Sequence, residues 1–340
     1  MQKVTNVYRV SQDELRKAFV FILSLIYASS FFMLSNDIFR DRENYTAYAR
    51  NFEEIFFRYD SILAKMFNEP LFLFLNYISS IFLDPEYIPR FFAFIVAFSV
   101  SFFIFRSARN SIMVVLSLFL LVLMPQLIHL QLVTLRQGLG VSLIIWVVIL
   151  SKNNLKIAFS IFIAGFVHSS FFIVFSMYVL DMFLSGRGCN KRYYFRLLVQ
   201  LFFSILMSLV FTYLAMFFGA RQAGAAHLTG DVNISGGALV LWGVVFSVFL
   251  TRSRVYFYNE QSVRLAYIGL IAYLAMYLIS PLAGRFIMTF LPFIVATMVS
   301  KFSYRELSVI FLILFANVVV YANTLKNNSL TYYGAEFFNF

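Results

Sequence analysis

The chain has 340 residues, of which 61% are hydrophobic and only 13% are charged. Soluble domains carry about 25% charged residues, so this composition excludes an ordinary soluble domain and predicts a polytopic membrane protein. A formal charge of +11 suggests nucleic acid as a partner in soluble proteins, but here the Lys and Arg residues cluster in a few short loops. We therefore attribute the charge to the positive-inside bias of membrane proteins and expect no nucleic acid partner.

Cysteine and histidine usage limits the chemistry further. Cys189 is the only cysteine, so no intrachain disulfide can form. The histidines His129, His168 and His227 are too scattered for a metal-ligand spacing. The sequence contains neither an acidic pair spaced for a divalent cation nor a glycine-rich nucleotide loop. We expect neither a metal nor another cofactor.

Basic segments set the predicted topology. The first span is expected at about 17–35, as an uncleaved helix with the N-terminus in the cytoplasm. The charge bias places further loops in the cytoplasm, namely 106–110, 151–156, 185–196, 251–264 and 300–306.

The apolar runs between these loops predict an all-α fold, a single membrane domain over 1–340 with about eleven crossings. After the first span, these are expected at 88–105, 111–130, 137–150, 157–168, 169–184, 197–219, 237–251, 265–280, 285–300 and 307–322. The apolar run 71–83 has thirteen residues, short of the roughly 20 that a span needs, and is interpreted as re-entrant or tilted. We expect two short helices in 157–184, with a hinge at 168–170, rather than one long helix.

Two external segments stand out. Within 36–69, aromatic and apolar residues recur at three- and four-residue spacing, which predicts an amphipathic helix along the outer surface. Its stripe consists of Tyr45, Tyr48, Phe52, Ile55, Tyr59, Ile62 and Met66. The segment 219–237 is rich in Gly and Ala and is interpreted as a flexible external loop.

Polar residues outside the cytoplasmic loops converge at the external ends of the predicted helices. A charged side chain deep in a span costs about 2.5–3.5 kcal/mol, so several arginines at one level indicate a water-accessible site. The converging residues are Asp41, Arg42, Tyr45, Glu69, His129, Arg136, Gln137, His168, Ser169, Ser170, Arg221, His227 and Arg285.

The chemistry of this set suggests an anionic, sugar-bearing ligand. Guanidinium groups suit phosphate, so Arg136 and Arg285 are predicted to bind a pyrophosphate. The alternatives are an arginine at the outer membrane interface or a buried partner of Glu69 or Asp41. His168 and Glu69 are rival candidates for the catalytic base; a hinge histidine and a helix-capping charge are the structural alternatives.

The remaining candidates are assigned to substrate binding with weaker support. Gln137 is either a ligand contact or a hydrogen-bonding group at a helix end. Arg221 is either a phosphate contact or a solvated charge. Asp41 and Tyr45 are sugar contacts or loop structure, and Ser169 completes the set.

Five motifs in this order resemble the EpsG/Wzy family of bacterial polysaccharide polymerases. They are "RDRENYTAYA", "NEPLFLFLNYI", "LRQGLGVSLIIWVV", "FVHSSFFIVF" and "GRFIMTFLPF", and they cover roughly 36–293. The sequence departs from the family pattern at Gly138, where a small residue such as Ala is usual. The region 186–264 carries no matching motif.

This resemblance implies a metal-independent glycosyltransferase in the bacterial inner membrane. It would join undecaprenyl-pyrophosphate-linked oligosaccharides, as in O-antigen or capsule synthesis, at a site facing the periplasm. Its partners would be these lipid-linked sugars, the lipid bilayer and a chain-length regulator. The alternatives are a polysaccharide flippase, an O-antigen ligase and a membrane O-acyltransferase.

Overall fold

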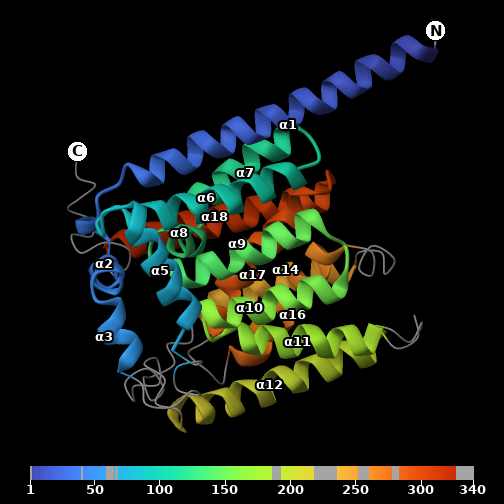
Figure 1. Ribbon diagram of the computed structural model, residues 1–340. Helices are drawn as coiled ribbons and strands as arrows, with labels where there is room; N and C mark the ends of the chain where they lie inside the picture. The colour runs from blue at the N-terminus through green and yellow to red at the C-terminus, as the bar shows by residue number, and fades with distance from the viewer. Residues whose placement is uncertain are drawn as a thin grey trace.

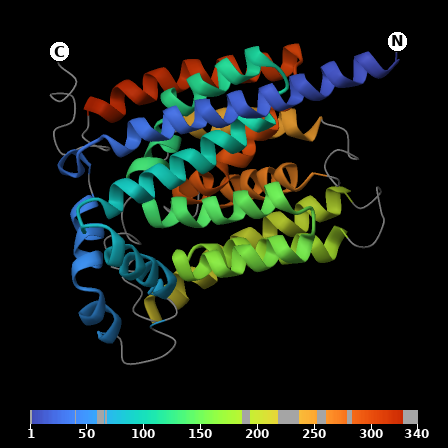
Figure 2. The same cartoon turned by 45° about the horizontal axis from the view of Figure 1, so that its top comes forward.

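The computed structural model describes residues 2–39, 41–58, 65, 68–185, 193–217, 236–251, 260–277 and 283–326, and all of its regular elements are helices. The long helices run side by side, while α2 and α3 cross one end of the bundle (Figure 1). A second view shows the same arrangement (Figure 2). The helices are α1 (Gln2–Phe32), η1 (Asn36–Ile38), α2 (Arg42–Arg50), α3 (Phe52–Phe57), α5 (Pro70–Phe82), α6 (Ile88–Ser107), α7 (Ser111–Leu123), α8 (Pro125–Leu132), α9 (Leu135–Leu150), α10 (Asn154–Val167), α11 (Phe171–Ser185), α12 (Tyr193–Phe217), α14 (Gly236–Leu250), α16 (Gln261–Met276), α17 (Ala283–Val299) and α18 (Tyr304–Lys326).

The predicted all-α class is confirmed, but eleven crossings are not. By length and hydropathy, two described segments qualify as spans, Glu14–Phe32 and Ile88–Ser107. A third qualifies if α7 and α8, which are bent by 71°, count as one broken span. The other apolar helices have 17 or fewer described residues in their apolar segments, somewhat short of the roughly 20 that a perpendicular crossing needs.

The core of the bundle lies around α16 and α17. Every residue from Phe286 to Val299 is buried, although Pro292 lies within that helix. Helix α17 packs along α16 and also contacts α6, while α9 lies against both α6 and α10. An all-round apolar helix belongs either in a protein core or in lipid, and the burial of α17 places it in the core of the bundle.

The predicted external helix is two short helices. It breaks at Asn51, whose backbone at φ −116° and ψ 37° is not helical. Of the predicted stripe, Tyr45 and Tyr48 are buried against Phe72 of α5. The stripe therefore packs on the bundle, while Tyr59, Ile62 and Met66 lie outside the described residues.

Helices are interrupted at Met124 and at the segment 168–170. The predicted span 111–130 is wrong as one helix, because it bends at Met124, directly before Pro125. Proline disfavours helical backbone at the residue before it, and Met124 is extended at φ −93° and ψ 107°, which is consistent with the break. The predicted pair within 157–184 is confirmed as α10 and α11, which are separated at His168, Ser169 and Ser170.

Two arginines assigned to cytoplasmic loops are buried helix residues instead. Arg196 lies on α12 and Arg264 on α16, and both form ion pairs with Asp181 of α11, which is 2% exposed. Arg264 also donates to Asn154 at the start of α10, with an Nη1–Oδ1 distance of 2.9 Å. Charge alone did not distinguish these partnered arginines from solvated loop residues.

Glycines allow α9 to approach its neighbours closely. A Cβ atom on Gly138 would lie 2.7 Å from a methyl of Val96 on α6 and 2.8 Å from the carbonyl oxygen of Leu130. A Cβ atom on Gly140 would lie 2.4 Å from the ring of Phe171. Both distances are shorter than a carbon contact permits, so glycine is required at both positions.

We predict that Gly138→Ala lowers the stability of the protein by about 1–3 kcal/mol, the usual cost of overpacking a core. The matched control is Gly243→Ala on α14, where an added Cβ atom meets nothing within 4 Å. Alanine is the better helix former by about 0.5–1 kcal/mol, so the control should be neutral or stabilising. Thermal unfolding in detergent measures both; equal midpoints would contradict the close packing of α9.

Candidate functional site

Glu69 occupies a strained position directly before α5. Its backbone is left-handed, with φ 62° and ψ 53°, and it precedes Pro70. Non-glycine residues rarely adopt this conformation, which costs of order 1–3 kcal/mol and persists only where the surroundings fix it. The side chain is 95% buried and does not cap α5. Glu69 therefore occupies the N-cap position of α5, as the helix-cap alternative expects, but its carboxylate makes no capping hydrogen bond.

Arg136 lies in the first turn of α9 and is paired with Glu69 through Nη1 and Oε2. A cation in a first turn faces the positive end of the helix dipole, so this position requires a compensating anion. The guanidinium carbon also lies 5.8–5.9 Å from the ring centroids of Tyr45, Tyr48 and Phe72. About a quarter of the Arg136 side chain stays exposed, which leaves it accessible to a ligand.

His168 contacts the other oxygen of the same carboxylate. It ends α10, and its Nδ1 lies 2.6 Å from Oε1 of Glu69. An ionised carboxylate can only accept hydrogen bonds, so Nδ1 carries a proton. The contact orients the imidazole and makes Nε2 the nitrogen that would exchange protons with a substrate. The predicted hinge is thus held by Glu69, not by the neighbouring serines alone.

The charge state of Glu69 follows from its partners. Burial alone raises the pKa of Glu69, but the charges and hydrogen bonds of Arg136 and His168 outweigh this and hold the pKa at about 2. The carboxylate is ionised at any neutral pH. A carboxylate with so low a pKa is a weak base, so this environment suits an orienting role.

Gln137, next to Arg136 on α9, is hydrogen-bonded to the backbone of Arg285 on α17. Its Nε2 donates to the carbonyl oxygen of Arg285, 2.6 Å away, and to Oγ1 of Thr289, 2.5 Å away. Gln137 is 2% exposed, and these bonds tie α9 to α17. The Arg285 side chain is half-buried and forms neither a hydrogen bond nor an ion pair with any described residue. Gln137 therefore serves as the helix-end hydrogen bonder.

Helix α2 anchors the turn that precedes Arg136. The hydroxyl of Tyr45 donates to the carbonyl oxygen of Val133 over 3.0 Å, and Nε of Arg42 donates to that of Leu132 over 2.9 Å. Arg42 is 1% exposed, and burial lowers its pKa to about 10, so it stays cationic. The carbonyls at the C-terminal end of α8 stabilise such a charge. The sequence places Arg42 among the converging polar residues but predicts neither a catalytic nor a binding role for it.

The other candidates fall into different settings. Asp41 is exposed, has a left-handed backbone and accepts from Nδ2 of Asn44 at 3.2 Å. Ser169 is 5% exposed beside His168. The hydroxyl of Ser170 is buried and has no hydrogen-bond partner among the described residues. Arg221 and His227, with nearly all of the predicted loop 219–237, lie outside the described residues.

Among the residues that the structure describes, no group of three or more His, Cys, Asp or Glu side chains could hold a metal ion. The site that remains is an ionic cluster of a carboxylate, a histidine and one arginine at one end of an apolar helical bundle, with the backbone of Arg285 tied beside it by Gln137.

The comparison with protein families identifies the chain. A profile described as the EpsG family matches residues 17–339, so the chain belongs to the EpsG family. Membership confirms the resemblance found in the sequence and indicates a polysaccharide-related polymerase in a membrane. Neither the curated proteins nor the solved structures contain a match to the chain.

We predict that Glu69→Gln destabilises the protein by up to about 3–5 kcal/mol, because it leaves Arg136 poorly compensated in a largely buried site. The matched control is Glu86→Gln, which removes an exposed ion pair to Arg50 with an N–O distance of 2.5 Å. Exposed pairs contribute about 0–1 kcal/mol. Unfolding midpoints compare the two; an equal loss in both variants would contradict a buried cluster.

The wild type and Glu69→Gln also provide a test of pH dependence. The pKa of Glu69 is lowered from 4.5 to about 2, so its ionisation stabilises the folded state fully above about pH 4.5. We expect the stability difference between the wild type and Glu69→Gln not to fall from pH 8 to pH 5, because Glu69 stays ionised and any proton gained by His168 adds attraction. It should shrink as the pH falls from 4.5 toward 2, and a loss already at pH 6 would contradict the low pKa.

Proposed function

We propose that this protein is a glycosyltransferase that polymerises undecaprenyl-pyrophosphate-linked oligosaccharide repeat units at the periplasmic face of the bacterial inner membrane. The observation that carries the proposal is the buried Glu69 carboxylate, which holds Arg136 and His168 together at one end of the bundle. Membership of the EpsG family supports the polymerase class.

The two arginines suit the leaving group. In this proposal, Arg136 and Arg285 bind the pyrophosphate of the donor, which gains negative charge as the glycosidic bond breaks. Guanidinium groups form paired hydrogen bonds with phosphate oxygens, and they stabilise such charge best when fixed in advance. Glu69 fixes Arg136, while Gln137 fixes the backbone of Arg285.

His168 suits the acceptor. The acceptor hydroxyl oxygen attacks the anomeric carbon of the donor sugar, and its proton passes to Nε2 of His168. The bond from the anomeric carbon to the pyrophosphate oxygen breaks, so undecaprenyl pyrophosphate leaves with the bonding pair. Glu69 keeps the proton on Nδ1 and stabilises the imidazolium that forms, as a carboxylate does in a catalytic triad.

Other residues have supporting roles in the proposal. Tyr45 and Tyr48 pack their buried rings against Arg136 and so help to fix it, and Asp41 is exposed for a sugar hydroxyl. The buried hydroxyls of Ser169 and Ser170 lie beside His168 and suit hydrogen bonding to the donor. A chain-length regulator is the expected protein partner in the membrane.

We predict that Arg285→Ala lowers polymer formation by about 10²–10³-fold, as loss of one preorganised charge-stabilising group does in other enzymes. Because its side chain bonds to no described residue, folding should be retained. Single repeat units should accumulate on the lipid carrier, measured by extracting lipid-linked sugars from a strain that depends on the variant. Arg136→Ala should give the same product pattern with lower stability.

The matched control is Arg50→Gln, an exposed arginine on α2 at the same end of the bundle. It should leave chain lengths unchanged. Wild-type chain lengths in Arg285→Ala, at equal protein levels, would overturn the pyrophosphate assignment. Repeat units trapped on the cytoplasmic face would indicate a flippase instead. Polymer that forms but is not joined to lipid A core would indicate a ligase.

A further inference from the structure

A basic cleft lies at the end of the bundle opposite the Glu69 cluster. It has a volume of about 650 Å³ and is lined by Arg16 of α1, Arg106 of α6, Arg109 and Lys301. The site-forming residues lie near the start of α6 and α9, whereas the cleft lies at the end of α6. The 20 residues of α6 separate the two regions by about 30 Å.

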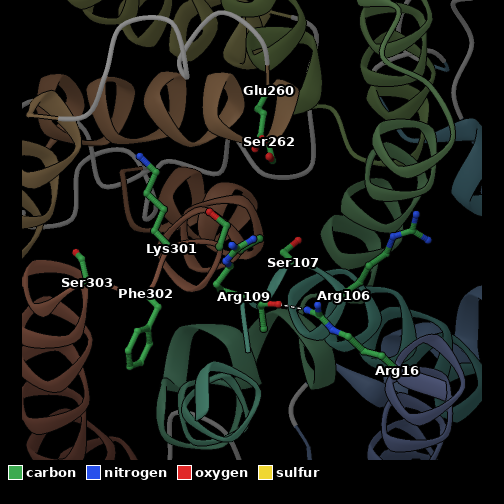
Figure 3. A pocket seen from close by; sticks show the side chains of 12 residues that line it. Arg16, Arg106, Ser107, Arg109, Glu260, Ser262, Lys301, Phe302 and Ser303 are labelled. Atoms are coloured by element: carbon green, nitrogen blue, oxygen red, sulfur yellow. Dashed lines mark hydrogen bonds between the residues drawn. The ribbon is translucent and has the colours of Figure 1, made fainter. Parts of the chain in front are cut away.

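The cleft carries unbalanced positive charge. Among the described residues of its lining, Glu260 is the only acidic one, against four basic ones. Arg16, Arg106 and Arg109 form no ion pair with any described carboxylate, although all three are exposed. Figure 3 shows Arg109 in the middle of the cleft, with Arg16 turned toward it to donate to the carbonyl oxygen of Ala108. Unpaired arginines on one concave surface repel each other and favour a bound anion.

Other arginines near this end of the bundle do have carboxylate partners. Arg264 is buried against Asp181, and Arg305 pairs with Glu306 at 2.9 Å. Among the described residues, the fold therefore supplies carboxylate partners to some arginines but not to the three in the cleft. Charge for topology alone requires no such concave grouping.

An apolar groove adjoins the basic cleft. It has a volume of about 650 Å³, runs along α1 and α6, and includes Ala18, Phe21 and Phe102. Glu14 and Lys17 also line it, and they form an ion pair with each other. Arg16 and Arg106 line both hollows, so the groove leads directly into the cleft. A phosphate site continuous with an apolar groove on the outside of a helical bundle matches the two parts of a phospholipid.

We propose that this composite surface binds an anionic phospholipid, with its phosphate in the basic cleft and an acyl chain in the groove. In the orientation assigned under the proposed function, the lipid belongs to the cytoplasmic leaflet, which is rich in anionic headgroups. A lipid bound here would hold α1 against α6 and the α17–α18 loop, because Arg16, Arg106 and Lys301 come from these three elements.

The test uses the full-length protein in a neutral detergent, with native mass spectrometry to count bound lipids. Phosphatidylglycerol should bind more tightly than phosphatidylcholine with the same acyl chains. Arg106→Gln and Arg109→Gln should each weaken phosphatidylglycerol binding about fivefold, the effect of one basic group at an anionic surface. The backbone N–H of Arg109 donates to Val299, and a glutamine retains that bond.

Lys156→Gln is the matched control, since Lys156 is an exposed cation at the start of α10 that lines neither hollow. Ala18→Trp should fill the groove and weaken lipid binding without a change of charge. Arg285→Ala should leave phosphatidylglycerol binding intact, which separates this site from the pyrophosphate site.

Three outcomes would overturn the proposal. The first is equal binding of the two lipids. The second is equal weakening by Lys156→Gln and the cleft variants, which would reduce the arginines to topology signals. The third is that millimolar inorganic phosphate displaces phosphatidylglycerol while Ala18→Trp has no effect, which would mean that the cleft takes a soluble phosphate.

Discussion

The buried carboxylate of Glu69 is the contact on which the arrangement of the site depends. One oxygen meets Arg136 at the start of α9, and the other meets His168 at the end of α10. Three chain segments that are far apart in sequence therefore meet at one anion. A largely buried arginine is unfavourable without an anion, and a strained backbone persists only where its surroundings fix it. The Arg136–Glu69 pair therefore stabilises both features. Each of these charges is costly to bury by itself, but paired with one another they form a preorganised site.

The surrounding helices keep this site in place. Helix α2 donates two hydrogen bonds to the turn before Arg136, so the external segment supports α9. Gln137 ties α9 to α17, and Gly140 lets α9 lie against Phe171, close to His168. These contacts use backbone carbonyls and close packing, which are rigid. Rigid support is what electrostatic stabilisation of a leaving group needs, since donors that must reorganise lose much of their effect.

The charged residues at the two ends of the bundle differ in burial and in ion pairing. At one end, arginine, histidine and glutamate neutralise one another and are largely buried. At the other end, Arg16, Arg106 and Arg109 are exposed and unpaired with described carboxylates. An exposed cation keeps its hydration, whereas a buried one requires a partner. The first arrangement suits transition-state charge, and the second suits a phosphate that stays bound beside a membrane.

Sequence patterns predicted which residues gather and offered Glu69 as a partner of Arg136 among the alternatives, but they did not predict the contact of His168 with Glu69 or the pairs of Asp181. Helical class, the break at His168 and the common level of Glu69, Arg136 and Arg285 all follow from hydropathy and the placement of basic loops. The breaks at Asn51 and Met124 were missed because a periodic apolar pattern continues across them; Pro125 was the available signal. The pairs of Asp181 join residues 15 and 83 positions away, and nothing local distinguishes Arg264 from a loop arginine. Partnership between distant charges is decided by tertiary packing, and it therefore becomes visible only once the helices are placed.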